Sequence, residues 1–299
     1  MSKETGNVIN EYHLNRHQPD KPQFAIHDLN SYIKTHRADT TKPHIHSFYQ
    51  VIWFKQGTGT HFVDFREYEV HKNVIFFITK DQVHYFDDNT RYEGVLIHFN
   101  DAFLIQNKKD ADLFQKSDLF NNPYQQPFCC IEEDMTSILD GYILQIKREL
   151  EYNDAFGKEA LLRNYLESFL IQMQRERNES DRNQNGIPLA LDEKRVQLIK
   201  FIKLMDENYN KGFTVAEYAR LLFVSSRTLS DLTRRLLNKA PSQMIQERII
   251  LEAQRLLLYT NLNVNQVGYR LGFDDPSYFV KYFRKHTKIS PTEFRKSVS

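Results

Sequence analysis

Two groups of side chains in this 299-residue sequence could recognise other molecules, and they lie in different parts of the chain. Between residues 44 and 99, histidines and aromatic residues recur, and such side chains can line a pocket for a small molecule. After residue 193, arginines and lysines outnumber acidic residues, and their cationic groups can bind the phosphates of a nucleic acid. The sequence therefore indicates a ligand-binding part followed by a part that binds a polyanion.

The distribution of charge supports this division. The whole chain has a formal net charge of +1, but residues 193–299 carry 19 Lys and Arg against 10 Asp and Glu, a net charge of +9. Residues 1–192 carry 21 basic and 29 acidic side chains, a net charge of −8. Because an acidic surface repels phosphates, we expect only the C-terminal part to contact a polyanion.

The basic part contains an internal repeat. Phe213–Val224 is similar to Leu262–Phe273 at an offset of 49 residues, and the similarity continues at an offset of 50 as far as Pro241 and Pro291. Each copy has a polar N-cap, a small residue where a second helix must cross closely, and a second capped helix start. These positions are Thr214, Ala219 and Ser225-Ser226 in the first copy, and Asn263, Gly268 and Asp274-Asp275 in the second. This layout predicts two helix-turn-helix units in tandem.

A long helix is predicted between the two units. In Pro241–Thr260, apolar residues recur at helical spacing from Met244 to Leu257. Such a helix would fix the distance between the units. One chain could then enter two successive segments of the major groove, which lie roughly 34 Å apart along DNA.

The same region resembles the AraC/XylS family of bacterial transcription regulators. The resemblance covers about residues 193–299 and rests on Arg248-x4-Ala253-x2-Leu256-Leu257, Val264–Phe273, Ser277–Lys285 and Ser290-Pro291-x2-Phe294-Arg295. It is stronger in the second repeat, although Gly268 replaces the usual Ala. In the first repeat, Phe223 replaces a turn Gly, Asp231 a common basic residue and Thr233 the usual Phe. The resemblance implies a regulator that binds double-stranded DNA, with RNA polymerase as a candidate partner.

Positions on the two predicted recognition helices give the candidate DNA contacts. They are Ser226, Arg227, Ser230, Asp231, Arg234 and Arg235 in the first repeat, and Ser277, Tyr278, Val280, Lys281, Arg284 and Lys285 in the second. Arg227 could form two hydrogen bonds with guanine, and Val280 could contact a thymine methyl group. Arg234, Arg235, Arg284 and Lys285 suit phosphates better. Because phosphates repel a carboxylate, Asp231 is expected to pair with Arg227 or Arg234 within the helix.

The acidic part is expected to begin with β-structure. Short β-branched and aromatic runs between Phe24 and Phe99 predict a β-sandwich or barrel. Apolar periodicity predicts helices at Glu132–Glu151 and Gly157–Arg177, which could pack on the barrel or form a dimer interface. The expected organisation is an arm or early edge strand at 1–23, a cupin-like sensor barrel at 24–105, a helical extension at 106–177, a polar linker at 178–192 and an all-α DNA-binding domain at 193–299. The fold class is therefore α+β and multidomain.

Two segments of the barrel region resemble cupin motifs. They are His44-Ile-His46-x3-Gln50-x6-Gly57 and Thr79-Lys-Asp81-x2-His84. The resemblance implies that His44, His46 and His84 would be the metal ligands if any metal were bound, with Gln50 as a weak fourth ligand. However, Gln50 stands where metal-binding cupins carry Glu, and the second motif lacks its Pro and Gly. We therefore expect no metal or cofactor, and histidines that line a ligand cavity or form hydrogen bonds within strands.

A small effector molecule is the expected ligand of the barrel. The candidate effector-binding residues are His44, His46, Tyr49, Trp53, His61 and His84, and Phe76 and His98 are further candidates for pocket walls. Because strand positions could not be assigned from the sequence, the pattern does not tell which of these side chains face inward.

The expected function is sequence-specific regulation of transcription in response to that effector, without enzymatic activity. Two alternatives stay open: a metal-binding cupin enzyme with an appended DNA-binding module, and a DNA-binding protein whose front domain only forms a homodimer. Cys129 and Cys130 are the two cysteines, which favours a reducing cytosol over a disulfide framework. The polar start of the sequence and the lack of a long apolar run predict a cytoplasmic protein without a signal peptide or membrane contact.

Overall fold

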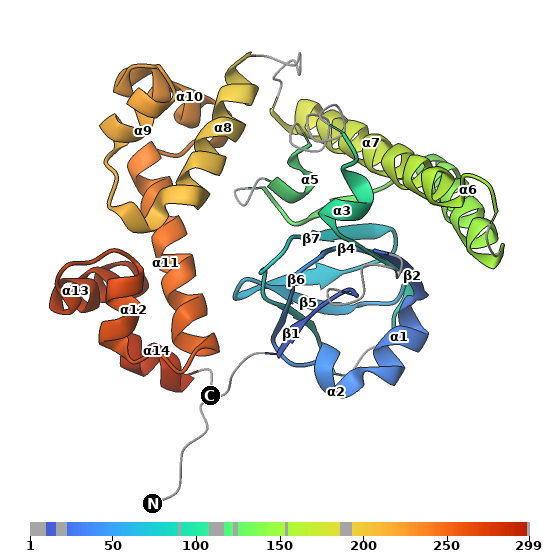
Figure 1. Ribbon diagram of the computed structural model, residues 1–299, viewed down its shortest axis with the longest axis horizontal. Helices are drawn as coiled ribbons and strands as arrows, with labels where there is room; N and C mark the ends of the chain where they lie inside the picture. The colour runs from blue at the N-terminus through green and yellow to red at the C-terminus, as the bar shows by residue number, and fades with distance from the viewer. Residues whose placement is uncertain are drawn as a thin grey trace, which may run out of the picture. The chain divides into compact units, whose positions relative to one another are not determined.

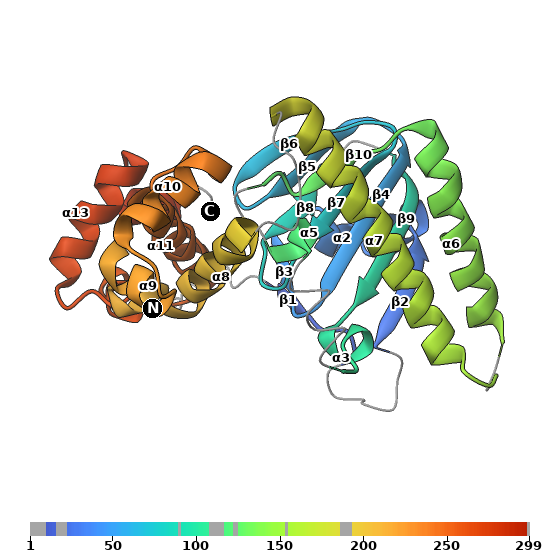
Figure 2. The same cartoon turned by 90° about the horizontal axis from the view of Figure 1, so that it is seen from above.

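The structure is a computed structural model that describes residues 10–15, 23–88, 91–107, 117–121, 125–152, 155–185 and 193–297. The chain forms two compact units, drawn in Figure 1 and turned by 90° in Figure 2. We call the described part of residues 10–190 the sandwich unit and that of residues 191–299 the helical unit.

The sandwich unit is built on two five-stranded sheets. The first has the strand order β1-β3-β8-β5-β6 and the second has the order β10-β7-β4-β9-β2. The strands are β1 (Asn10–Tyr12), β2 (Phe24–Asp28), β3 (His44–His46), β4 (Tyr49–Gln56), β5 (Gly59–Val63), β6 (Arg66–Val70), β7 (Val74–Ile78), β8 (His84–Phe86), β9 (Glu93–Phe99) and β10 (Phe128–Cys130). Short helices connect them: α1 (Leu29–Thr35), α2 (Arg37–Thr40), α3 (Asp101–Leu104) and α5 (Asp118–Asn121).

Two apolar cores lie on opposite faces of the second sheet. Ile52, Phe54 and Phe76 point into the sandwich and pack with residues of the first sheet such as Val63 and Val70. The alternate residues of the same strands point to the other face, where two long helices cover them. Burial on both faces explains why β4 and β7 are almost continuously apolar.

The two covering helices are α6 (Glu133–Glu151) and α7 (Lys158–Asn185). Figure 2 shows α7 running across the second sheet with α6 alongside it. Leu139 and Ile143 of α6 and Leu166 and Phe169 of α7 are buried in the core that these helices share with the sheet. The two helices predicted at Glu132–Glu151 and Gly157–Arg177 are therefore confirmed. They cover the second sheet within the sandwich unit.

The sandwich unit extends beyond the boundaries that the sequence predicted for the barrel. Within the expected arm, Asn10–Tyr12 forms an edge strand that pairs in parallel with β3, whereas residues 1–9 and 16–22 lie outside the described residues. Phe128–Cys130, expected within the helical extension, forms β10 and pairs with β7. The prediction of a linker from residue 178 is wrong as far as Asn185, because α7 continues to that residue. Residues 186–192 of the expected linker lie outside the described residues.

The helical unit has two similar halves joined by a long helix. Its elements are α8 (Glu193–Asn208), the 3-10 helix η1 (Tyr209–Lys211), α9 (Val215–Leu221), α10 (Ser226–Leu237), α11 (Pro241–Tyr259), α12 (Val264–Arg270), α13 (Pro276–Thr287) and α14 (Pro291–Ser297). The α9–α10 and α12–α13 pairs are the two predicted helix-turn-helix units, and α11 is the predicted connecting helix. Among the described residues, no helix combines the length and apolar character that crossing a bilayer requires.

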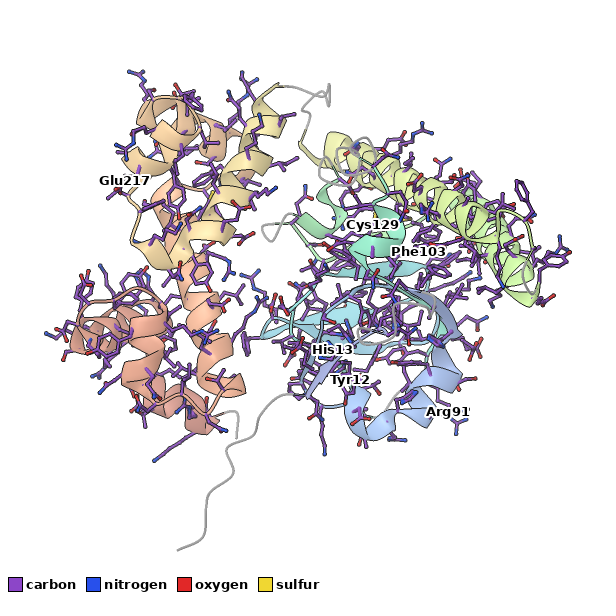
Figure 3. All side chains as sticks on the ribbon, viewed as in Figure 1. Tyr12, His13, Arg91, Phe103, Cys129 and Glu217 are labelled. Carbon is purple, nitrogen blue, oxygen red and sulfur yellow. The ribbon has the colours of Figure 1, made fainter. Side chains whose placement is uncertain are left out.

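Local capping explains where these short helices begin. The Thr214 side chain accepts a hydrogen bond from the Glu217 amide, and Glu217, labelled in Figure 3, accepts one from the Thr214 amide. Asn263 and Gln266 form the same reciprocal pair at the start of α12. Such capping boxes satisfy amide groups that the first helical turn leaves without partners. The sequence predicted both N-caps, and both are confirmed.

Arg248 on α11 holds the first half of the unit together. Its side chain is 12% exposed, and its guanidinium lies 2.6 Å from the Asp206 carboxylate on α8 and 2.9 Å from that of Glu252. The same group lies over the Tyr209 ring, 4.4 Å from its centroid. The two carboxylates raise the pKa of Arg248 despite its burial. This partly buried charge is therefore paired, as a desolvated guanidinium requires.

The turn of the first helix-turn-helix unit is strained at Phe223. This residue has a φ of 58°, in the left-handed region, and its side chain is 95% exposed. The corresponding residue of the second unit is Gly272, with a φ of 84°. Phe223→Gly is therefore expected to raise the free energy of unfolding by about 0.5–1 kcal/mol, because glycine adopts this conformation without a Cβ clash. Urea unfolding followed by circular dichroism checks this, and an unchanged or lower midpoint would contradict it.

Candidate nucleic-acid interface and ligand site

The exposed face of α10 carries the candidate DNA contacts of the first unit. Its N-cap, Ser225, accepts a hydrogen bond from the Thr228 amide at 3.0 Å, which fixes the start of the helix. Leu229, Leu232 and Thr233 are buried on one face, so they orient the opposite face outward. Ser226, Arg227, Asp231, Arg234 and Arg235 are exposed there, and Ser230 is half-buried.

The predicted pairing of Asp231 within α10 is confirmed for Arg227. The Arg227 Nε and Asp231 Oδ2 atoms are 4.0 Å apart, and the two side chains are 92% and 71% exposed. An exposed pair at this spacing contributes about 0.3–0.5 kcal/mol. It therefore restrains Arg227 only weakly and leaves its guanidinium available to a base or phosphate.

The exposed face of α13 repeats this arrangement in the second unit. Asp275 caps the helix by accepting a hydrogen bond from the Ser277 amide at 2.8 Å, and Phe279 and Phe283 anchor the buried face. The predicted contacts Ser277, Tyr278, Lys281, Arg284 and Lys285 are exposed, and Val280 is half-buried. The exposed surface of α13 is thus cationic and aromatic.

Close helix crossing in the second unit depends on Gly268. A Cβ atom at this position would lie 3.2 Å from Cβ of Phe279 on α13. In the first unit Ala219 occupies the corresponding position and is likewise buried. The prediction of small residues at the crossing is therefore confirmed. One exposed side chain on α10 was not predicted as a contact: Thr228, next to Arg227. The repeat offered a signal for it, because Thr228 corresponds at the offset of 50 to the predicted contact Tyr278.

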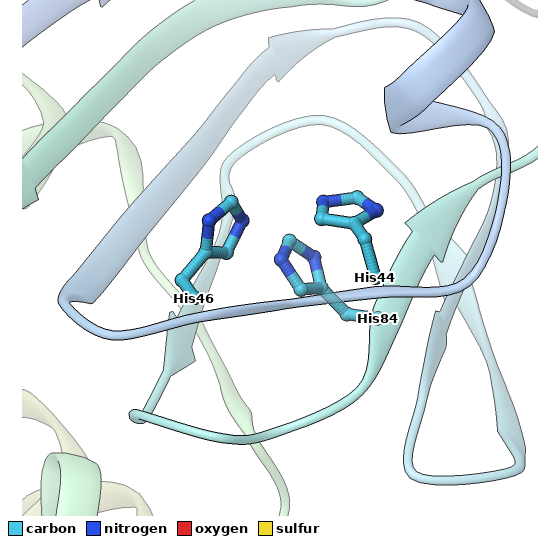
Figure 4. A group of neighbouring side chains, drawn as sticks. All are labelled: His44, His46 and His84. Atoms are coloured by element: carbon cyan, nitrogen blue, oxygen red, sulfur yellow. The ribbon is translucent and has the colours of Figure 1, made fainter. Parts of the chain in front are cut away.

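The interior of the sandwich unit contains five buried histidines. His44, His46, His61, His84 and His98 are each at most 3% exposed. His84 is central, with ring centroids 4.4 Å from His44, 4.9 Å from His46 and 5.3 Å from His61. Figure 4 shows His44, His46 and His84 converging from neighbouring strands. His98 lies next to His46 at 6.1 Å.

These buried imidazoles largely lack hydrogen-bond partners. Both ring nitrogens of His46, His61 and His84 are without a partner, as are Nε2 of His98 and the side-chain oxygen of Gln50. Burial lowers the pKa of His61 to about 3, and burial is also the main cause that lowers the pKa values of His44, His46, His84 and His98. The interior therefore presents neutral imidazoles with free lone pairs and N–H groups.

Two of the predicted effector-binding residues do not face this interior. Trp53 packs on the other side of the second sheet, where its ring lies 6.4 Å from that of Phe169 on α7. Tyr49 lies on the same side and contacts the ring of Phe120 on α5 at 5.0 Å. The prediction that Tyr49 and Trp53 line the sensor pocket is therefore wrong, because both residues occupy the outward-facing positions of β4.

Three further residues named from the sequence do face this interior: Gln50, named as a weak fourth metal ligand, and Phe76 and His98, named as candidates for pocket walls. Gln50 and His98 face each other across β4 and β9, and Phe76 packs against the ring of His61 at 5.0 Å. His27 on β2 was not predicted, and its ring lies 5.3 Å from that of His98. Side chains of a strand alternate between the two faces of a sheet. Because Phe24 and Ile26 of β2 pack on the face covered by α6 and α7, His27 points to the interior, and this alternation could have predicted its position.

Comparisons with known proteins agree with both sites. Residues 29–170 match the family model described as an AraC-like ligand binding domain, and residues 218–297 match one described as a helix-turn-helix domain. The transcriptional activator RhaR of Enterobacter sp. is 23% identical over 84% of this chain and 86% of its own length. Histidine kinase P4 of Formosa agariphila is 32% identical over 34% of this chain, but the match spans only 8% of that protein. The solved structure of ToxT from Vibrio cholerae is 15% identical, covers 93% of this chain and 99% of its own, and has a TM-score of 0.43.

Proposed function

Because the chain belongs to the AraC family of DNA-binding transcription regulators, we propose that α10 and α13 read one operator sequence and that a small molecule in the sandwich unit regulates this binding. The family comprises regulators rather than enzymes, so the alternative of a cupin enzyme with an added DNA-binding module is not retained. We further propose that the protein acts in the cytoplasm, with RNA polymerase as a candidate partner.

One observation carries this proposal. Two helices of 12 residues, each with a side-chain N-cap and one buried face, present their other face to solvent in a unit of net charge +9. An α-helix fits the major groove, which is roughly 12 Å wide. Two such helices on one chain can therefore read two segments of the same operator.

The two helices offer different chemistry for recognition. Arg227 near the start of α10 can form two hydrogen bonds with guanine, while Val280 on α13 can contact a thymine methyl group. Arg234, Arg235, Arg284 and Lys285 lie farther along the helices, and we assign them to phosphates. The weak pairing of Arg227 with Asp231 leaves the Arg227 guanidinium available to a base.

Arg227→Ala is expected to lower the affinity for the operator by about 1–3 kcal/mol and to relax the preference at one base position. The physical reason is the loss of a bidentate pair of hydrogen bonds from the guanidinium, which among the bases only guanine can accept together. The measurement is selection of binding sites from a random DNA library, followed by fluorescence anisotropy on the selected sequence.

Arg220→Ala is the matched control for this experiment. Arg220 is exposed and belongs to the same helix-turn-helix unit, but it lies on α9 rather than on the recognition helix. It should reduce binding slightly and equally for all sequences, because it removes charge without removing a base contact. If Arg220→Ala changed the base preference and Arg227→Ala did not, the assignment of α10 as a reading helix would be wrong.

Regulation by a small molecule is supported by the sandwich interior. The partnerless nitrogens of His46, His61 and His84 are polar groups that a ligand could satisfy. A thermal-shift screen of the whole protein against sugars and small aromatic compounds tests this part. A ligand that raises the unfolding temperature should also change the affinity for the operator. If the front domain only forms a dimer, no compound in the screen should change the unfolding temperature or the operator affinity.

A homodimer is proposed from the surface of the two long helices. Ile138 and Leu144 on α6 are 46% and 47% exposed, and Leu161 on α7 is 39% exposed. Exposed large apolar side chains of this kind can contribute to a protein interface. Sedimentation equilibrium at micromolar concentration should give twice the chain mass of 35.6 kDa, and a strictly monomeric protein would refute this part.

A further inference from the structure

We propose that His44, His46 and His84 bind one divalent transition-metal ion inside the sandwich unit. One nitrogen from each side chain can be chosen so that all three lie within 4.8 Å of one another. Imidazole nitrogen is a preferred ligand of Zn²⁺, Co²⁺, Ni²⁺ and Cu²⁺. The proposal departs from the expectation from the sequence that no metal is bound, and it goes beyond the proposed function, which does not require a metal.

The first supporting observation is the unsatisfied polarity of this cluster. All four ring nitrogens of His46 and His84 are buried without a hydrogen-bond partner. Leaving a buried polar group without a hydrogen-bond partner destabilises the folded protein, so a cluster of such groups favours a ligand that satisfies them. A metal ion would convert one nitrogen of each ring from an unsatisfied acceptor into a ligand.

The second observation concerns the orientation of His44. Its Nδ1 atom lies 2.8 Å from the backbone oxygen of Lys42, and because a carbonyl can only accept, Nδ1 carries the proton. The remaining nitrogen, Nε2, is then deprotonated and able to bind a metal. A second hydrogen bond of this kind accompanies nearly every metal-binding histidine, because it fixes the tautomer and the ring orientation.

The geometry is compatible with binding after a small adjustment. In a tetrahedral zinc site with Zn–N distances of about 2.0–2.1 Å, two ligand nitrogens lie roughly 3.4 Å apart. The chosen nitrogens of His44, His46 and His84 lie within 4.8 Å of one another, and the backbone pairing of His44 with His84 across β3 and β8 holds the residues that carry them side by side, so metal binding requires the rings to move closer together. Three neutral imidazoles leave at least one coordination position for another ligand.

The same interior provides a matched control residue, His61. His61 is fully buried, both of its nitrogens lack partners, and its ring lies 5.3 Å from that of His84. It is nevertheless not part of the group of converging nitrogens, and its nearest rings include those of Phe76 and Phe86. His61→Phe therefore removes a buried imidazole of the same kind from an aromatic environment without removing a proposed ligand.

The experiment uses the full chain without a polyhistidine tag, stripped with a chelator and dialysed against buffered Zn²⁺ or Co²⁺. Elemental analysis should give about one Zn²⁺ per chain, and Co²⁺ should give the visible absorption bands of a site with nitrogen ligands. His84→Phe and, independently, His46→Gln should reduce bound metal at least about tenfold, because each removes one of three ligands. His61→Phe should retain about one equivalent.

Circular dichroism establishes for each variant that the sandwich unit is folded before metal is measured. Wild-type protein that binds well below one equivalent of both ions would overturn the proposal without any variant being needed. Equal loss of metal in folded His61→Phe and His84→Phe would also overturn it, because the binding would then not be specific to the three histidines. Operator binding is measured separately on the same samples, so failure of the metal site and failure of the regulator function give different results.

Discussion

Replacing Arg284 and Lys285 on α13 together with glutamate is expected to lower the affinity for DNA by at least about two orders of magnitude near 0.15 M salt. Both side chains are exposed in the last turn of the helix, next to the face that carries Ser277 and Lys281. Each cation that contacts a phosphate releases a condensed counterion, and a glutamate in its place repels the backbone instead. The loss should therefore be similar for all DNA sequences.

A salt series by fluorescence anisotropy separates this effect from misfolding. The slope of log K against log salt should become shallower by about 1.8 for the double variant, because two phosphate contacts are lost. The matched control is Lys200→Glu with Lys203→Glu, which makes the same change of charge on exposed positions of α8 in the same unit. If the control had an equal effect, α13 would not be the surface that contacts the DNA backbone.

Gly272→Ala is expected to give the largest loss of stability, about 2–4 kcal/mol in the free energy of unfolding. A Cβ atom at this position would lie 1.8 Å from the backbone oxygen of Asn210 in η1. Backbone cannot move aside as a flexible side chain can, so the turn of the second helix-turn-helix unit or η1 must shift. The φ of 84° adds strain for any residue with a Cβ.

Gly212→Ala separates the cost of the left-handed conformation from the cost of the clash with Asn210. Gly212 has a φ of 67°, but among the described residues no heavy atom beyond its own chain neighbours lies within 4 Å of the position that its Cβ would occupy. The Gly212→Ala variant should therefore lose only about 1 kcal/mol of its free energy of unfolding, which is the cost of the left-handed conformation. Urea unfolding of both variants measures the difference. Equal losses would show that the contact with Asn210 has no energetic consequence, and the account of this turn would have to be abandoned.

The helix-turn-helix units could be predicted in detail because their signals are local. A capping residue such as Thr214 or Asn263 acts within its own first turn, and the small residues Ala219 and Gly268 mark the crossing within each unit. The repeat added a second, independent copy of each signal. Helix boundaries, buried faces and the pairing of Arg227 with Asp231 all followed from spacing along the chain.

The sandwich unit was harder to predict because its central strands have no apolar alternation. Val51–Phe54 on β4 are all buried, since one face of the sheet meets the interior and the other meets α6 and α7. With apolar partners on both sides, hydrophobicity gives no inward or outward direction, so the sequence could not separate Tyr49 and Trp53 from the side chains that face the histidines. Only tertiary packing decides between the two registers.

The end of α7 shows a different limit of the sequence prediction. Residues 175–185 contain no apolar side chain, and this absence was taken to indicate a linker. Arg, Glu and Gln nevertheless have high intrinsic helix propensity, so α7 can continue to Asn185 without apolar side chains in this stretch. For the ligand site, the sequence could indicate that His44, His46 and His84 belong together, but not that their nitrogens would be left without partners.

Hydroxyl-radical footprinting of the full chain on a selected operator tests the central claim most directly. Two recognition helices joined by α11 should protect two segments of the same face of the duplex, centred about one helical turn of 10–10.5 base pairs apart. Arg227→Ala should weaken protection of one segment and Lys281→Ala that of the other. Protection of a single segment, or a footprint that the two variants alter in the same way, would contradict the assignment of α10 and α13 as two separate reading helices.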